Sequence, residues 1–233
     1  MGRWGVVLGL VAWSAWAQAP ARFDVLAARE LLASSAELPS VAQRAGAWTV
    51  ERPGAKRVVV DLKKDWLSWT EDTTVRWVTN ELTLLPTAGD DVIALYSRVD
   101  APQDGQRAPT VTLRAWRVTP ATRAFTETTE PFAELPPLAD FVAKADAAKV
   151  AELPEADVTP WVVRVVELPH GGATAHVHYS AFALEMDCDK GKRRAAPALL
   201  CRNVAALKYG ARQGTWDRAT ASFHFREKGK PKR

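Results

Sequence analysis

Apolar segments rich in β-branched residues recur through the first half of the chain, at residues 57–62, 75–85, 92–96 and 111–115. Apolar and polar positions alternate most clearly over residues 111–115. Such alternation is typical of strands with one buried and one exposed face, as antiparallel sheets allow. Turn-forming residues separate the second and third of these segments, so residues 75–96 predict a β-hairpin.

Two segments have the helical period instead. Asp24 can cap a short helix that ends before Pro39. Its predicted apolar face is formed by Phe23, Leu26, Ala27 and Leu31. Residues 137–153 follow a helical face between two prolines, which predicts one amphipathic helix that connects two strand-rich halves.

Strand-like segments return in the second half, at residues 161–166, 173–186, 203–209 and 219–225. One side of the long segment 173–186 changes from polar to apolar along its length, which we attribute to a bulge or a twist. The residues concerned are His176, His178 and Ser180, followed by Phe182, Leu184 and Met186. Separately, residues 119–125 resemble residues 217–223, and both sequences predict hairpin tips.

These patterns predict a mainly β protein of the α+β class. We expect an antiparallel, strand-rich sandwich or two small β lobes, with an N-terminal helix and a central amphipathic helix. The predicted organisation is a signal peptide, a helix with the first β-rich half, a connecting helix, a second β-rich half and a basic disordered tail. The corresponding ranges are 1–17, 18–130, 131–154, 155–226 and 227–233.

The first 17 residues predict export. A positive start at Arg3 precedes the apolar run 6–13, and Ala15-Trp16-Ala17 is a small-residue cleavage site. We therefore expect a periplasmic or extracellular protein. No later stretch is apolar enough to span a bilayer, so the mature chain should have no transmembrane segment. The sequence has no Asn-x-Ser/Thr glycosylation site, which favours a bacterial source.

Cys188 and Cys201 both fall in the exported part, where an oxidising compartment favours pairing. A disulfide between them would stabilise the fold by roughly 3 kcal/mol on the chain-entropy model. The alternative is two buried free thiols. The formal net charge of +4 is mild, and it does not by itself imply a nucleic-acid partner.

Two groups of residues are candidates for ligand binding. Trp66 and Trp69 lie in a charged segment and could stack on a sugar ring or another flat ligand, or they could simply pack onto the sheet. The loop between the cysteines carries four basic residues, which could hold an envelope glycan or another anionic surface, or could be solubilising. These are Lys190, Lys192, Arg193 and Arg194.

A third candidate is a metal site. His176 and His178 would face the same way on a strand, and His224 lies on another predicted strand. Three such ligands could hold zinc or another divalent transition metal, although two histidines on the exposed face of a sheet need no metal. The sequence contains no G-x-S-x-G nucleophile elbow and no glycine-rich phosphate loop.

Together these features favour an exported, non-catalytic envelope or extracellular binding or structural module without a cofactor. The alternative is a metal-dependent hydrolase that uses the His-x-His pair. Whether the protein is an enzyme stays open at this point, with the absence of nucleophile and phosphate-binding motifs against it.

Overall fold

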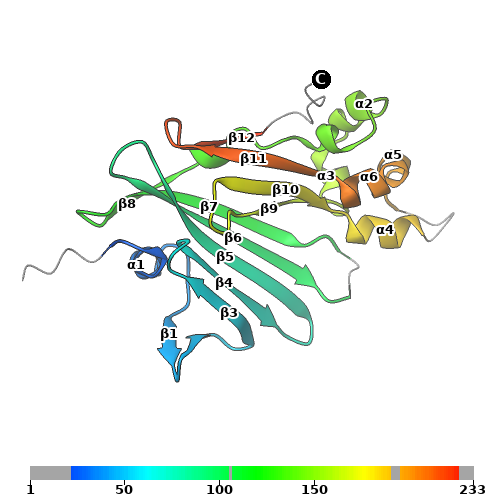
Figure 1. Cartoon of the computed structure of the whole chain (residues 1–233). Coiled ribbons are helices and arrows are strands. Elements are labelled where there is room, and N and C mark those ends of the chain that lie inside the picture. Colours follow the sequence, from blue (N-terminus) through cyan, green and yellow to red (C-terminus); the bar gives the residue numbers. More distant parts are fainter. Residues whose placement is uncertain (1–21, 105–106, 190–194, 226–233) are drawn as a thin grey trace, which may run out of the picture.

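The computed structural model describes residues 22–104, 107–189 and 195–225, and the prediction of a mainly β fold is confirmed. Within these residues, strands form three antiparallel sheets of six, four and two strands. Figure 1 shows the four-stranded sheet lying next to β6 and β7 of the larger sheet, with most of the short helices gathered at one end.

The six-stranded sheet is a meander in which each strand pairs with the next along the chain. Its strands are β3 (Ala55–Asp61), β4 (Trp66–Asp72), β5 (Arg76–Pro86), β6 (Val92–Pro102), β7 (Thr110–Thr119) and β8 (Ala124–Thr128). The predicted hairpin over residues 75–96 is the β5–β6 pair, in which Leu85 lies opposite Ile93. Local pairing of this kind follows from the short turns between strands.

The four-stranded sheet has the order β12-β11-β10-β9. Its strands are β9 (Val163–Glu167), β10 (Thr174–Ser180), β11 (Ala211–Asp217) and β12 (Ser222–Phe225). A separate hairpin joins β1 (Val41–Arg44) to β2 (Ala47–Val50). Ala45 and Gly46 form its two-residue turn, and both have positive φ angles, 49° and 83°, as a type I′ turn requires.

The two similar sequences both form hairpin tips, as predicted. Thr119 pairs with Ala124 across the β7–β8 turn, and Asp217 pairs with Ser222 across the β11–β12 turn. The residue before the second strand has a positive φ in each case, 55° at Arg123 and 52° at Ala221. Asp217 Oδ1 also accepts a hydrogen bond from the Ala219 N–H, which is a local contact that favours a turn.

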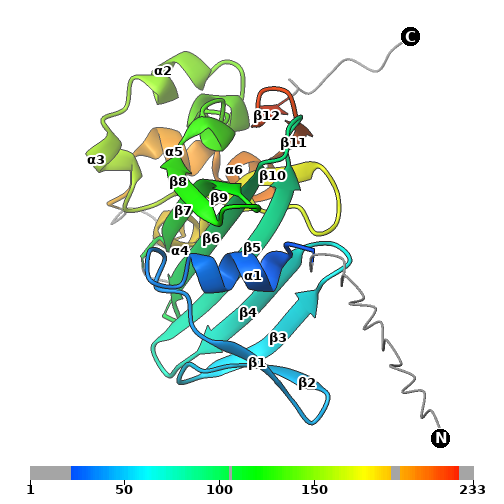
Figure 2. The same ribbon diagram turned by 90° about the vertical axis from the view of Figure 1, so that its left-hand side faces the viewer.

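The N-terminal helix α1 (Val25–Leu31) lies across one face of the six-stranded sheet (Figure 2). Asp24 caps it as predicted, because Oδ1 accepts hydrogen bonds from the N–H groups of Leu26 and Ala27. The buried side of the helix is Val25, Ala28 and Leu32. It is therefore turned relative to the predicted face, of which Phe23 and Leu31 reach only the edge of the core.

The predicted continuous helix over 137–153 is wrong. The segment contains the 3-10 turn η2 (Leu138–Phe141) and the short helix α2 (Ala147–Ala151). A further 3-10 turn, η1 (Glu130–Phe132), precedes it, and the helix α3 (Glu155–Val158) follows it. The chain is extended at Val142, and the Ala143 N–H donates to Asn203 Oδ1 at 2.9 Å. This tertiary hydrogen bond replaces the intrahelical one, so the helix is interrupted.

Two predicted strands are helical. The segment 173–186 ends as a strand at Ser180 and continues as α4 (Phe182–Cys188), so the change from polar to apolar residues marks a change of secondary structure and not a bulge. The segment 203–209 is largely α6 (Val204–Tyr209), which follows α5 (Ala198–Arg202). Alanine and leucine favour helices, and short apolar runs do not distinguish helix from strand.

The buried residues form two clusters. One lies between α1 and the six-stranded sheet, and Trp69 and Trp116 are its largest members. The other contains residues of both sheets and of the helices that follow β10, with Ile93 and Leu95 from β6 and Val177 from β10. The six-stranded and four-stranded sheets therefore contribute to one shared core, which fixes their relative position.

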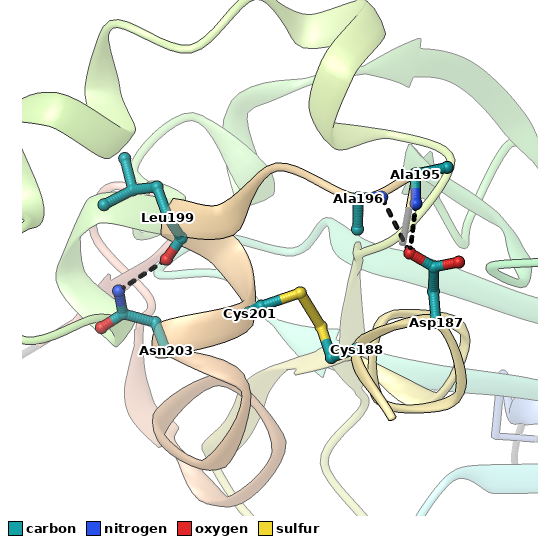
Figure 3. Close-up of a disulfide and its surroundings, with 7 residues drawn as sticks. All are labelled: Asp187, Cys188, Ala195, Ala196, Leu199, Cys201 and Asn203. Carbon is teal, nitrogen blue, oxygen red and sulfur yellow. Dashed lines mark hydrogen bonds between the residues drawn. A yellow bond between two sulfur atoms is a disulfide. The ribbon is translucent and has the colours of Figure 1, made fainter. Parts of the chain in front are cut away.

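The predicted disulfide is present. Cys188 at the end of α4 is bonded to Cys201 in α5, with 5.6 Å between their Cα atoms (Figure 3). Next to it, a carboxylate oxygen of buried Asp187 accepts hydrogen bonds from the N–H groups of Ala195 and Ala196, both at 2.8 Å. A disulfide is compatible with an extracellular location. Within the described part of the chain, no helix is long and apolar enough to cross a membrane.

Candidate functional site: a cleft between the two sheets

Three polar contacts hold β9 and the loop after it against the six-stranded sheet. Ser97 Oγ donates to the Val166 carbonyl at 3.1 Å, and Thr83 Oγ1 donates to the Pro169 carbonyl at 3.2 Å. Glu81 Oε2 accepts from the Leu168 N–H at 3.1 Å. These bonds pair backbone groups that β9 would otherwise leave buried without partners, and so they anchor one sheet on the other.

Beside this anchor lies an open cleft of about 800 Å³. Its floor comes from one face of β5 and β6, and its wall comes from one face of β9 and β10. The principal lining residues are Trp77, Thr79, Glu81, Val99 and Ala101 on the floor, and Val165, Glu167, His176, His178 and Ser180 on the wall. These positions alternate along each strand, so the period of two places them on a common face.

The histidine pair, His176 and His178, lies on the wall of this cleft, on β10. His176 is directly opposite Glu167 in the β9–β10 pairing. Nδ1 of His178 lies 3.7 Å from Oε1 of Glu167. The intervening residue, Val177, points to the shared core and is fully buried. One strand thus gives the core its apolar face and the cleft its imidazoles.

Trp66 and His170 close one end of the cleft. Their ring centroids are 4.0 Å apart, and His170 Nε2 lies 3.6 Å from Asp61 Oδ2. Gly171 has a φ of +74°, and a Cβ at this position would lie only 2.2 Å from Cδ of Lys64. The loop between β9 and β10 therefore fits closely against the β3–β4 turn, and a glycine is required for this approach.

Glu81 is an acidic group in an unusual environment. Burial raises the pKa of its carboxyl group, and the nearby charge of Glu167 raises it further, while the hydrogen bond from the Leu168 N–H opposes both effects. No lysine or arginine occurs among the described residues that line the cleft. The cleft therefore has a negative character, which favours a neutral or positively charged ligand.

Two polar atoms at the cleft are buried without a hydrogen-bond partner among the described residues. They are the indole Nε1 of Trp66, whose side chain is only 9% exposed, and the hydroxyl Oγ1 of Thr79. Buried polar groups are nearly always paired in folded proteins, so each unpaired one calls for a functional or structural reason. A hydroxyl or carbonyl group on a ligand would reach either atom only if the Trp66 or Thr79 side chain moved, because each atom is itself buried.

Trp69, the second tryptophan of the predicted ligand surface, does not reach the cleft. It lies three residues from Trp66 on β4 and therefore faces the other side of the sheet, where it is 1% exposed. Its Nε1 donates to Glu71 Oε1 at 3.1 Å, and its ring stacks near that of Tyr96. Trp66 and Trp69 consequently form no joint surface.

The three predicted metal ligands are not brought together. His224 lies on β12, opposite Thr215, and is separated from β10 by β11. Its Nδ1 is 3.0 Å from Glu134 Oε2, and its Nε2 is 3.2 Å from Thr220 Oγ1. Among the residues that the structure describes, no group of three or more His, Cys, Asp and Glu side chains could hold a metal ion.

The remaining predictions fall outside the described residues. These are the basic residues Lys190, Lys192, Arg193 and Arg194, the predicted signal peptide over 1–17 and the predicted basic tail over 227–233.

The sequence reasoning gave no site role to three residues of the cleft, Trp77, Glu81 and Glu167, and it considered His170 only as a residue close in sequence to the His176–His178 pair. A signal existed for two of them, because Trp77, Thr79 and Glu81 alternate along a predicted strand and place an acidic group on an otherwise half-buried face. No comparable signal links them to Glu167 or His170, since that proximity depends on how the two sheets pack.

Comparison with known proteins adds little to this geometry. No protein family matches the sequence, and no curated protein matches it. A solved structure, described as a domain of an uncharacterized protein from Porphyromonas gingivalis W83, is 13% identical and has a TM-score of 0.44. The alignment covers 85% of this chain and 86% of that chain.

Proposed function

We propose that this is an exported, non-catalytic binding protein whose inter-sheet cleft takes one small organic molecule. The cleft volume of about 800 Å³ falls within the range of roughly 300–1,000 Å³ that small-molecule sites occupy. Export to a bacterial periplasm or to the medium is supported by the N-terminal sequence pattern, and the disulfide is compatible with it.

The observation that carries the proposal is an exposed tryptophan on the floor of the cleft. Trp77 retains 46% of its surface exposure, although large aromatic rings are usually buried. Val99, Ala101 and Pro109 extend this apolar surface within the cleft. A flat or apolar part of a ligand could stack on it, while the imidazoles and carboxylates of the wall fix its orientation.

A binding role fits the polar groups better than catalysis does. Ser97 and Glu81 both contact backbone groups of β9 and its following loop, so their hydrogen bonds hold the two sheets together. A catalytic nucleophile needs an adjacent base that is free to take its proton. Ser97 Oγ donates its proton to a carbonyl group instead.

The ligand class can be narrowed further. An envelope glycan with an apolar sugar face could stack on Trp77, and the carboxylates of the cleft suit any ligand, neutral or positively charged, that carries hydrogen-bond donors. A polyanionic partner does not suit them. An anionic surface would have to bind elsewhere, through the basic residues between Cys188 and Cys201.

The proposal is tested with a fragment library that contains neutral, cationic and anionic aromatic molecules, using ligand-observed NMR on the full-length mature protein. Fragments that bind the wild type should lose binding in Trp77→Ala and keep it in Tyr209→Ala, because Tyr209 is exposed on α6, outside the cleft. A library without any binder, or binders that are indifferent to Trp77→Ala, would refute the proposal.

A metal-dependent hydrolase is the second candidate, and it rests on His176 and His178 alone, which β10 places on one face, since with Glu167 they do not form a three-ligand group. Isothermal titration with zinc decides it. Stoichiometric binding that disappears in the His176→Ala/His178→Ala double variant would support a metal site. If the wild type releases no more heat on zinc addition than the double variant does, the metal-dependent function is rejected.

A further inference from the structure

We propose that the cleft selects a positively charged organic molecule, an amine with an apolar body, whose ammonium group lies between Glu81 and Glu167. This inference rests on the proposed function and adds the charge of the ligand. The two carboxylates come from different sheets, one on the floor and one on the wall, so a group that enters the cleft meets both.

The charge balance of the cleft supports a cation. Both Glu81 and Glu167 line it, and the charge of Glu167 affects the titration of Glu81, so the two groups are close enough to repel one another. Lys64, at the closed end, lies 3.8 Å from Asp61 and so has a carboxylate partner of its own. An ammonium group would offset the repulsion between the carboxylates and the desolvation of Glu81.

The arrangement of residues along the floor indicates what the rest of the ligand, apart from its ammonium group, should be. Trp77 lies opposite Ala101, and Glu81 lies opposite Ser97, with Thr79 between them on the same face of β5. Four residues of a strand span about 13 Å. The floor therefore passes from an apolar, aromatic end to an acidic end over the length of a small amphipathic molecule.

Two residues of the same cleft carry polar atoms that are unpaired within the described structure. Trp66 Nε1 is a donor, and the Thr79 hydroxyl is both donor and acceptor. The Trp66 side chain is about nine-tenths buried and lines the cleft. A hydroxyl or carbonyl oxygen on the amine would reach these buried atoms only if the Trp66 or Thr79 side chain moved.

Three probes share a phenethyl group and differ in charge: phenethylamine and phenethyl alcohol, which match in size, and hydrocinnamate, which carries the larger carboxylate. Their affinities at neutral pH are measured by following the indole N–H signals of the protein by NMR. We expect the amine to bind roughly tenfold more tightly than the alcohol, as one charge-assisted hydrogen bond predicts, and the anion to bind most weakly.

Glu81→Gln and Glu167→Gln should each remove most of this preference and leave the affinity for the alcohol unchanged. Glu81→Gln retains an acceptor for the Leu168 N–H. Glu167 is largely exposed, so Glu167→Gln still tests the charge preference if Glu81→Gln perturbs the fold. Glu152→Gln, at an exposed position after α2 that lies outside the cleft, is the matched control and should change no affinity.

The outcomes distinguish the two proposals. Equal affinities for amine and alcohol, together with an unchanged amine affinity in both glutamate variants, would overturn charge selection and leave the binding cleft intact. If the three probes leave the indole signals of the cleft unchanged while other fragments bind there, the inference fails and the proposed function stands; if no fragment of the library binds, both fail.

Discussion

Trp66 and Trp69 lie three residues apart on β4 and occupy opposite faces of the same sheet. On the face covered by α1, the polar groups around Trp69 form a connected network. Trp69 Nε1 and Asn80 Nδ2 both donate to Glu71, and the Tyr96 hydroxyl donates to Asn80 Oδ1 at 2.8 Å. Every bond in this network is internal to the sheet, so its members specify the packing.

On the other face, the groups around Trp66 are arranged differently. The indole nitrogen of Trp66 and the hydroxyl of Thr79 are buried without a partner among the described residues, and Trp77 is exposed. The network around Trp69 is satisfied within the fold. On the cleft face, Ser97, Thr83 and Glu81 are paired with β9 and its following loop, whereas the Trp66 nitrogen and the Thr79 hydroxyl are not paired within the described part of the chain. The cleft is therefore a feature of one face of the six-stranded sheet, and the other face is closely packed under α1.

The largest expected effect lies on the packed face. Trp69→Ala should lower the free energy of unfolding by about 3–5 kcal/mol, because it opens a cavity in a core where the side chain is almost fully buried. Trp77→Ala is the matched change on the cleft face and should cost less than about 1 kcal/mol, because half of that ring is already exposed. Urea denaturation of both variants checks this, and similar losses would remove the contrast.

A smaller effect distinguishes two neighbours on β5. Asn80→Leu removes the acceptor of the Tyr96 hydroxyl and one of the donors to Glu71, and we expect a loss of about 1–3 kcal/mol in the free energy of unfolding. Thr79→Val removes a hydroxyl that has no partner in the described structure, so it should be neutral within about 0.5 kcal/mol. A marked loss in Thr79→Val would mean that its hydroxyl is already paired within the fold.

Local features of this fold were predictable from the sequence. The tips at Thr119–Ala124 and Asp217–Ser222, the Asp24 cap and the Cys188–Cys201 disulfide all depend on residues close together in the chain or on the chemistry of a single pair. The turn at Asp61–Trp66 belongs to the same class, since Asp65 also has a positive φ, 49°. Turn chemistry is local, so the sequence alone contains it.

The helices after β10 were not predictable in the same way. Segments such as Val204–Tyr209 are short and apolar, and their helical state follows from packing against α4, α5 and β10 and not from a periodic pattern. The segment around Val142 is the converse case. Its sequence has a helical period, but a hydrogen bond to Asn203, some 60 residues away, interrupts the helix.

The cleft was predictable only in part. Alternation on β10 places His176 and His178 on one face, but it does not say what lies opposite them. That depends on the contacts between Ser97 and Val166 and between Glu81 and Leu168, which join residues 69 and 87 positions apart. Alternation puts Trp66 and Trp69 on opposite faces of β4, because they are three residues apart. It does not show which face α1 covers, so it could not predict which of the two tryptophans lines the cleft.

The smallest expected effect concerns Glu81 and depends on pH. Burial raises the pKa of this carboxyl group in the folded protein above its ordinary value of 4.5, so the fold favours the protonated form. The resulting stabilisation is complete below the unfolded value and is lost as pH rises through the folded pKa. Glu81→Gln keeps the group neutral at every pH, so the variant should gain stability over the wild type as pH rises from mildly acidic to neutral.

Denaturation of the two proteins side by side at both pH values measures this gain, since the other titrating groups are common to both. A constant difference would show that the Glu81 charge is as well solvated in the fold as in the unfolded chain. A wild type that is more stable at neutral pH would show that the hydrogen bond from the Leu168 N–H to the charged carboxylate outweighs its burial. Either result would show that the fold satisfies Glu81 as fully as it satisfies the polar groups around Trp69. The two faces of the sheet would then not differ at Glu81.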